Sequence, residues 1–90
     1  MSQCCMKFLV KGRVQGVGFR YHTAHQANKH NITGYARNLP SGDVEVLACG
    51  DEQDVRALGK WLQAGPQTSR VDSVTSEMLQ RQHLAGFSMH

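Results

Sequence analysis

The segment GRVQGVGFR, residues 12–20, contains residue types that can bind an anion. Its glycines stand at 12, 16 and 18, and three glycines in seven positions favour a loop with unusual backbone angles. The N–H groups of such a loop can converge on one point, and a helix that begins at Arg20 would add unpaired donors and partial positive charge. The Arg20 guanidinium offers the planar fork that suits phosphate oxygens. These residues indicate either an anion site or a tight turn followed by a solvated arginine.

The glycine spacing and the charge distribution narrow the class of anion. The spacing fits neither GxxxxGK[ST] nor GxGxxG, so the two common nucleotide-binding loops are excluded on sequence. The net charge is +3, and the ten Lys and Arg residues are scattered along the chain, whereas nucleic-acid-binding domains usually cluster them. We therefore expect a small phosphorylated molecule as the partner and no nucleic acid.

Strand patterns provide the framework around this segment. Apolar and polar residues alternate in 5–11, where Met6, Phe8 and Val10 share one face, and this pattern is typical of a half-buried strand. The turn sequence Leu-Pro-Ser-Gly at 39–42 joins two further strands into a hairpin. The expected strands are 5–11, 33–38, 43–49, 70–79 and a short terminal one at 86–90.

Two helices are expected between these strands. Residues 20–30 contain no Gly or Pro, although their apolar stripe is thin. Residues 52–63 have a wider stripe at helical spacing, and Ala-Gly-Pro at 64–66 ends the helix. The residues of this stripe are Val55, Leu58, Trp61 and Leu62. We expect Trp61 to lie in the core.

The order of the elements is strand, helix, strand, strand, helix, strand. This order matches the ferredoxin-like split βαβ sandwich, an α+β fold in which an antiparallel sheet carries two helices on one face. Ninety residues are too few to divide between two cores, so we expect a single domain over 1–90. The fold alone implies no function.

Two segments of the chain resemble a known family. GRVQGVGFR at 12–20 and GYARNLPSGDVEV at 34–46 closely resemble the signature segments of the acylphosphatase family, and the resemblance extends over nearly the whole chain. It implies a cofactor-free, monomeric hydrolase with the ferredoxin-like fold. Its substrates would be small acyl phosphates, whose carboxyl–phosphate anhydride is cleaved to a carboxylate and inorganic phosphate.

The resemblance also implies roles for particular residues. Arg20 matches the family's phosphate-binding arginine, and Asn38 matches its water-orienting asparagine. Beside these two catalytic residues, the backbone amides that match the phosphate cradle belong to Gln15, Gly16, Val17, Gly18 and Phe19. An alternative for Asn38 is that its side chain only caps the turn that follows it.

Two other features of the first helix could have bound ligands. His22 and His25 have a spacing compatible with a metal ion, but no third ligand in a matching frame is evident, so we expect surface residues and no metal site. Tyr21 could stack against a substrate, but we expect it to pack against the rest of the fold.

The cysteines leave two alternatives open. In a sheet of strand order 4-1-3-2, Cys5 and Cys49 lie at neighbouring strand ends and point away from the helices, whereas Cys4 falls on the core face. A cross-strand disulfide is geometrically plausible if the Cα atoms lie within about 7 Å. Against it, a cytosolic chain keeps its thiols reduced.

Two rival functions and the location follow from the remaining features. An RNA-binding sheet needs exposed aromatic residues on its open face, but the strand faces expected there are charged, with Lys7, Lys11, Asp43 and Glu45. The second rival is a carbamoyl-phosphate-handling role, as in acylphosphatase-like domains of larger maturation proteins, and we expect it less because no further domain is present. The sequence has no membrane-spanning run and no secretory signal pattern, so we expect a cytoplasmic protein without membrane contact.

Overall fold

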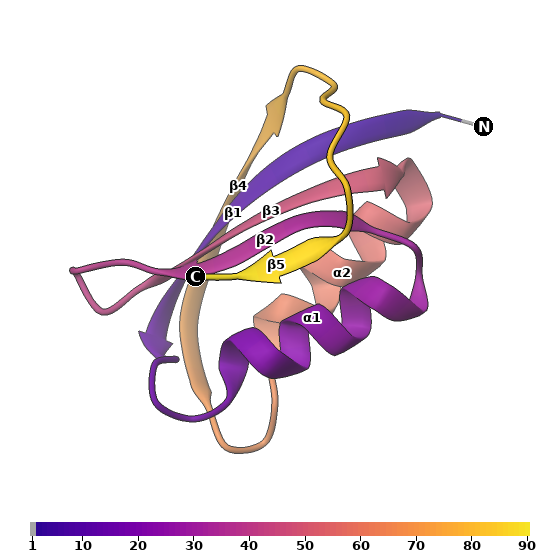
Figure 1. Cartoon of the computed structure of the whole chain (residues 1–90). Coiled ribbons are helices and arrows are strands. Elements are labelled where there is room, and N and C mark those ends of the chain that lie inside the picture. Colours follow the sequence, from indigo (N-terminus) through magenta and orange to yellow (C-terminus); the bar gives the residue numbers. More distant parts are fainter. Residues whose placement is uncertain (1) are drawn as a thin grey trace.

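The structure, a computed structural model, describes residues 2–90 and confirms every expected element. Element bounds differ from the expected ones by a few residues at most. The first strand is the most extended of them, and the first helix begins one residue earlier than expected. In chain order the elements are β1 (Gln3–Arg13), α1 (Phe19–Lys29), β2 (Thr33–Asn38), β3 (Val44–Asp51), α2 (Glu52–Ala64), β4 (Arg70–Leu79) and β5 (Phe87–Met89) (Figure 1).

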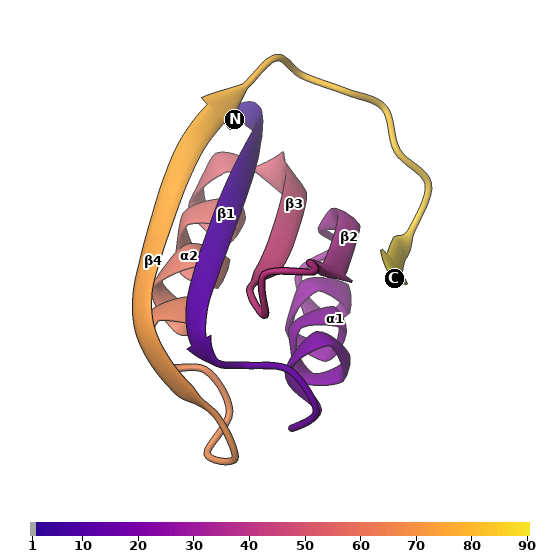
Figure 2. The ribbon, with the colours of Figure 1, turned by 90° about the vertical axis from the view of Figure 1, so that its left-hand side faces the viewer.

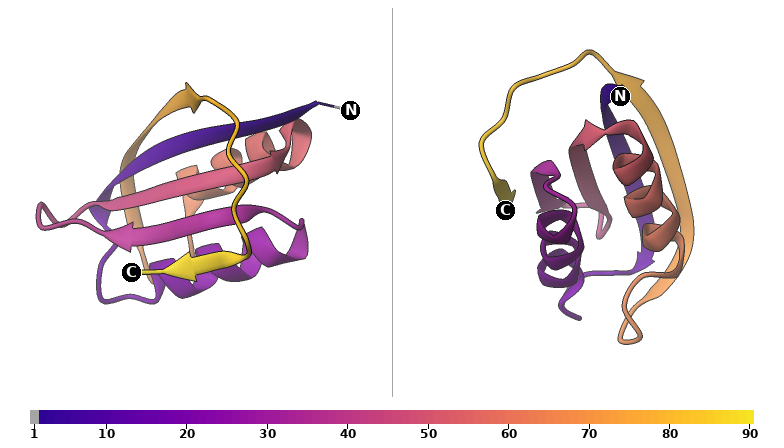
Figure 3. Two further views of the ribbon diagram at one scale, coloured as in Figure 1. Left: turned by 45° about the horizontal axis from the view of Figure 1, so that its top comes forward. Right: turned by 90° about the vertical axis from the view of Figure 1, so that its right-hand side faces the viewer.

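The five strands form one sheet in the order β4-β1-β3-β2-β5, which confirms the predicted order of the first four. Both helices cover the same face of this sheet (Figure 2). The prediction of an entirely antiparallel sheet is wrong at one edge, because β5 pairs with β2 in parallel. The reason is the connection after β4: the chain passes from one edge of the sheet to the other, and there it runs in the direction of β2 (Figure 3).

The main core lies between the sheet and the helices. It contains the inward faces of β1 and β3, where Phe8, Val10 and Val46 are almost completely buried. Three members of the predicted α2 stripe are buried against them: Val55, Leu58 and Leu62. Trp61 packs against this core but stays half-buried. The apolar face of α2 therefore packs against the apolar faces of the strands, as the helical and strand periodicities predict.

A second, smaller cluster lies on the opposite face of the sheet. Cys5 and Cys49 pair across β1 and β3 with their Cα atoms 4.1 Å apart, and their sulfur atoms form a disulfide. Leu47 is buried beside them, and Tyr35 and Leu79 pack around the cluster. Cys4 is buried on the core side, as the alternation predicted, and is a free thiol.

Paired polar and charged side chains also lie on this open face. Lys11 forms an ion pair with Asp43 at 3.0 Å, and Glu45 accepts hydrogen bonds from Arg37 and from the Tyr35 hydroxyl. Burial, and secondly the Glu45 carboxylate, raises the pKa of Tyr35 above its ordinary value. These side chains on the open face are therefore paired with one another. Among residues 2–90, no helix is both long and apolar enough to cross a membrane.

Candidate active site

The glycine-rich loop connects the end of β1 to the start of α1. Gly16 and Gly18 have φ angles of 76° and 78°, in the left-handed region that glycine adopts without strain. Gly18 is the N-cap of α1 and offers no side chain to the helix. These two positions explain why the loop can turn sharply and present its backbone rather than its side chains.

Among residues 2–90, the positive potential at the N-terminus of α1 is not neutralised by neighbouring side chains. This helix end has no side-chain cap and no acidic residue in its first turn. Within the described part of the chain, no acceptor bonds the main-chain N–H groups of residues 15–19. Unpaired donors and the positive end of the helix dipole favour an anion at this position. This helix end is therefore compatible with the interpretation of 12–20 as an anion site, which stays a prediction.

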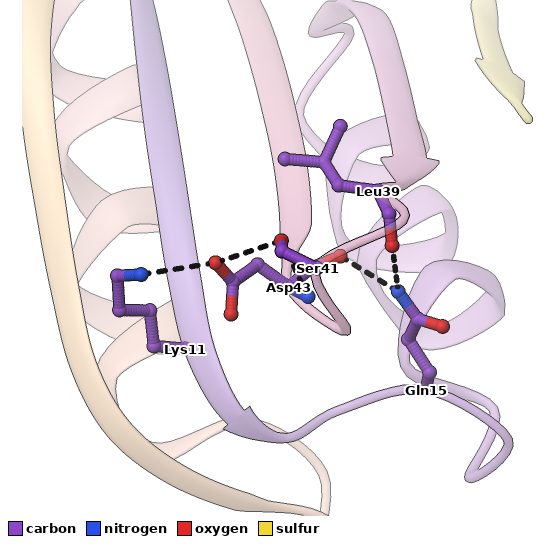
Figure 4. Close-up of polar contacts among 5 residues, drawn as sticks. All are labelled: Lys11, Gln15, Leu39, Ser41 and Asp43. Carbon is purple, nitrogen blue, oxygen red and sulfur yellow. Dashed lines mark hydrogen bonds and ion pairs between the residues drawn. The ribbon is translucent and has the colours of Figure 1, made fainter.

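The loop is tied to the hairpin that carries Asn38. The Gln15 side-chain Nε2 donates to Leu39 O at 2.8 Å and to Asp43 O at 2.9 Å (Figure 4). This role of the Gln15 side chain was not predicted, because no local pattern in the sequence indicates a contact across 24 and 28 positions. On the other side of the loop, Thr68 Oγ1 donates to Val17 O at 2.7 Å. The loop is therefore held between the β2–β3 turn and the α2–β4 connection.

Arg20 and Asn38 meet at one main-chain oxygen. Arg20 Nη1 and the Asn38 main-chain N both donate to His90 O, and each donor–acceptor distance is 2.9 Å. His90 N in turn donates to Ala36 O, so the residue is held along β2. The end of the terminal strand thus brings together two residues that lie 18 positions apart in the sequence and come from different elements.

The side chain of Asn38 has an unusual environment. Its Oδ1 atom is buried and has no hydrogen-bond partner among residues 2–90. The following turn is closed by its own backbone, with Leu39 N donating to Asp43 O and Gly42 N to Leu39 O. The alternative in which this side-chain oxygen caps the turn is therefore wrong. A buried acceptor without a partner costs about 1–3 kcal/mol, and a catalytic role or a bound water is among the explanations for such a group.

A hollow of about 220 Å³ lies beside the loop. It is lined by Val14, Gly16, Gly18, Phe19, Arg20, Tyr21 and Met89. Four of the six predicted phosphate-binding residues therefore share its wall, whereas Gln15, Val17 and Asn38 do not line it. A larger hollow of about 510 Å³ lies beside Asp51 and Asp54, but its acidic side chains do not suit a phosphate.

The expectation that Tyr21 packs inside the fold is wrong. Its side chain is 65% exposed. The buried face of α1 is formed by Phe19, Thr23, Ala24 and Ala27, and a residue two positions after Phe19 is turned about 200° away from it around the helix. His22 and His25 are exposed, as expected. Among the described residues, no group of three or more His, Cys, Asp or Glu side chains is arranged to hold a metal ion.

Comparison with known proteins identifies the family. The Acylphosphatase family model matches residues 6–89. An acylphosphatase of Photobacterium profundum is 55% identical over 99% of both chains. The solved acylphosphatase of Coxiella burnetii superposes with a TM-score of 0.94 at 34% identity, covering 98% of this chain and 93% of the other. A full-length HypF in its phosphate- and nucleotide-bound form matches with a TM-score of 0.90 at 26% identity, over 99% of this chain but 12% of its own. The chain belongs to the acylphosphatase family.

Proposed function

We propose that Arg20 binds the phosphoryl group of a small acyl phosphate and that Asn38 orients the attacking water. The observation that carries this proposal is the convergence of both residues on His90 O, beside a loop whose N–H groups have no acceptor among residues 2–90. Family membership supports acyl phosphate hydrolysis as the overall reaction.

The phosphoryl group would be bound both by the positive charge of Arg20 and by hydrogen-bond donors that point toward it. The amides of residues 15–19 donate from one side, and the Arg20 fork adds two parallel donors with a positive charge. Donors that are fixed before the reaction stabilise the charge on the phosphoryl oxygens without reorganisation. Gln15 and Thr68 hold the loop in this arrangement through their side chains.

The water would be oriented by the Asn38 amide. This side chain has no acidity near neutral pH and acts only by hydrogen bonding. The water oxygen bonds to phosphorus while the bond from phosphorus to the carboxylate oxygen breaks, and the carboxylate leaves with the electron pair. The substrate's own phosphate accepts the water proton, so no protein base is required. Phosphoryl transfer needs positioning and electrostatic stabilisation of this kind rather than covalent help.

The remaining parts of the proposal concern the state of the protein. We propose that residues 1–90 act as one domain and as a monomer in the cytoplasm, without a metal ion or cofactor and without nucleic acid. The paired charges on the open face of the sheet support the last point, because Glu45 engages both Tyr35 and Arg37 there. A base-stacking surface would instead need free aromatic rings.

A colorimetric assay with benzoyl phosphate tests the proposed function. Wild-type protein should release benzoate and phosphate at the same rate before and after dialysis against a chelator, and added magnesium should not raise that rate. Activity that disappears with the chelator and returns with zinc or magnesium would contradict the proposed site.

A further inference from the structure

Two of the large hydrophobic side chains exposed on the surface gather beside the phosphate-binding loop. Four such side chains are exposed among the described residues: Tyr21, Met78, Leu84 and Met89. Tyr21 and Met89 are 65% and 48% exposed, and both line the hollow that contains Arg20. Scattered exposed hydrophobic residues need no explanation, but two in the wall of one binding hollow do.

The two side chains come from elements that also hold Arg20. Tyr21 follows Arg20 in the first turn of α1, and Met89 precedes His90, whose main-chain oxygen accepts from Arg20. Val14 and Phe19 add two further apolar residues to the same wall. The hollow is therefore polar where the glycine backbone and the guanidinium lie, and apolar next to them.

The Tyr21 ring is supported from one side. The His22 ring lies edge-on to it, with the ring centroids 5.7 Å apart and the planes at 79°. An aromatic side chain has few rotamers to lose when it binds a ligand, so a supported ring makes an effective apolar contact.

We propose that Tyr21 and Met89 form a subsite for the acyl group of the substrate and that this subsite favours aromatic over short aliphatic acyl phosphates. The inference rests on the proposed function, because it requires the phosphoryl group at the loop and Arg20. An acyl phosphate has a charged phosphoryl end joined directly to its acyl end, and the hollow has the same order of polar and apolar walls.

The test is the ratio of kcat/KM for benzoyl phosphate to kcat/KM for acetyl phosphate. Aromatic contacts of this kind are worth a factor of about 3 to 10. Tyr21→Ala and Met89→Ala should each lower the ratio by about that factor, mainly through KM for benzoyl phosphate. Tyr21→Phe should keep the wild-type ratio, because the ring and not the hydroxyl makes the contact.

Met78→Ala is the matched control, since Met78 is similarly exposed but lies on β4, at the other edge of the sheet from β5. It should leave the ratio unchanged. An unchanged ratio in Tyr21→Ala, or an equal loss on both substrates, overturns the subsite while acetyl phosphate hydrolysis still supports the proposed function. A wild-type protein that hydrolyses neither substrate overturns both.

Discussion

The two helices pack on the same face of the sheet but begin in opposite ways. At the start of α2, the Asp51 side chain accepts a hydrogen bond from Gln53 N at 3.0 Å, and Glu52 and Asp54 place negative charge in the first turn. At the start of α1, Gly18 provides no cap, and the first turn has no acidic residue. A glycine in place of a capping side chain costs a helix about a few tenths of a kcal/mol.

This difference supports the proposal that the N-terminus of α1, and not that of α2, binds the anion. At the N-terminus of α2, Gln53 N donates to the Asp51 side chain and Glu52 N donates to Ser2 O, and the acidic side chains there repel an anion. The N-terminus of α1 keeps its donors and its positive potential, and Arg20 adds a full charge in the same turn. The stability that α1 loses at its start is offset by tertiary contacts, such as the hydrogen bonds of Gln15 and Thr68 with neighbouring segments.

The largest expected effect comes from changing the arginine of α1. Arg20→Lys keeps the charge but loses the planar fork. The loss of a phosphoryl-binding arginine in comparable chemistry lowers the rate about 10³- to 10⁵-fold, and inorganic phosphate should also bind poorly. Steady-state kinetics and phosphate inhibition measure both effects. Arg56→Lys on α2 is the control and should retain full turnover; an equally active Arg20→Lys variant would remove Arg20 from the mechanism.

The Asn38→Ala variant tests whether the N-terminus of α1 and Arg20 are sufficient for catalysis. Asn38→Ala should lower turnover by about 10²- to 10³-fold, as expected for the loss of one preorganised hydrogen-bonding group. Phosphate affinity should change little, because the α1 donors and Arg20 remain. One preparation should be measured for melting temperature, phosphate inhibition and turnover, with Asn28→Ala as a control. A destabilised but active variant would contradict the water-orienting role.

The disulfide lies far from the proposed site, so its removal should lower the stability of the protein without changing its activity. Cys5 lies near the start of β1 and Cys49 near the end of β3, whereas the glycine-rich loop follows the other end of β1. The bond closes 44 positions of chain, for which chain entropy allows up to about 4 kcal/mol of stabilisation. Reductant should therefore lower the melting temperature and leave turnover at moderate temperature unchanged.

Intact-mass measurement after alkylation in denaturant checks the disulfide directly. Without reduction, one cysteine, Cys4, should be alkylated, and with reduction all three. In the native protein Cys4 should react slowly, because burial, and secondly the Glu52 carboxylate, raises the pKa of its thiol. Three alkylated cysteines without reduction would show that Cys5 and Cys49 are not joined.

The smallest expected effect comes from changing the N-cap residue of α2. Asp51→Ala removes the α2 cap and should lower the free energy of unfolding by about 1 kcal/mol. Turnover and phosphate inhibition should not change, because the α2 N-terminus has no role in the site. Thermal unfolding and steady-state kinetics on the same sample measure both. Weaker phosphate inhibition in this variant would contradict the proposed division between the two helix ends.

Local patterns in the sequence determined the elements and the faces of the strands. The period of two placed Cys4 and Cys5 on opposite sides of β1, and the helical spacing of Val55, Leu58 and Leu62 placed the buried face of α2. The glycine spacing in 12–20 predicted the loop between β1 and α1. These structural predictions are confirmed because each depends on residues that are close together in the chain, whereas the anion-binding role of the loop stays a prediction.

The tertiary structure alone decided how the site is completed. The His90 main-chain oxygen accepts from Arg20, which lies 70 positions earlier in the chain, and from the Asn38 N–H. The Gln15 side chain reaches the hairpin across 24 and 28 positions. The parallel pairing of β5 and the exposure of Tyr21 were likewise missed. No local periodicity encodes such contacts, because they depend on where the chain returns after β4 and on which face of α1 meets the sheet.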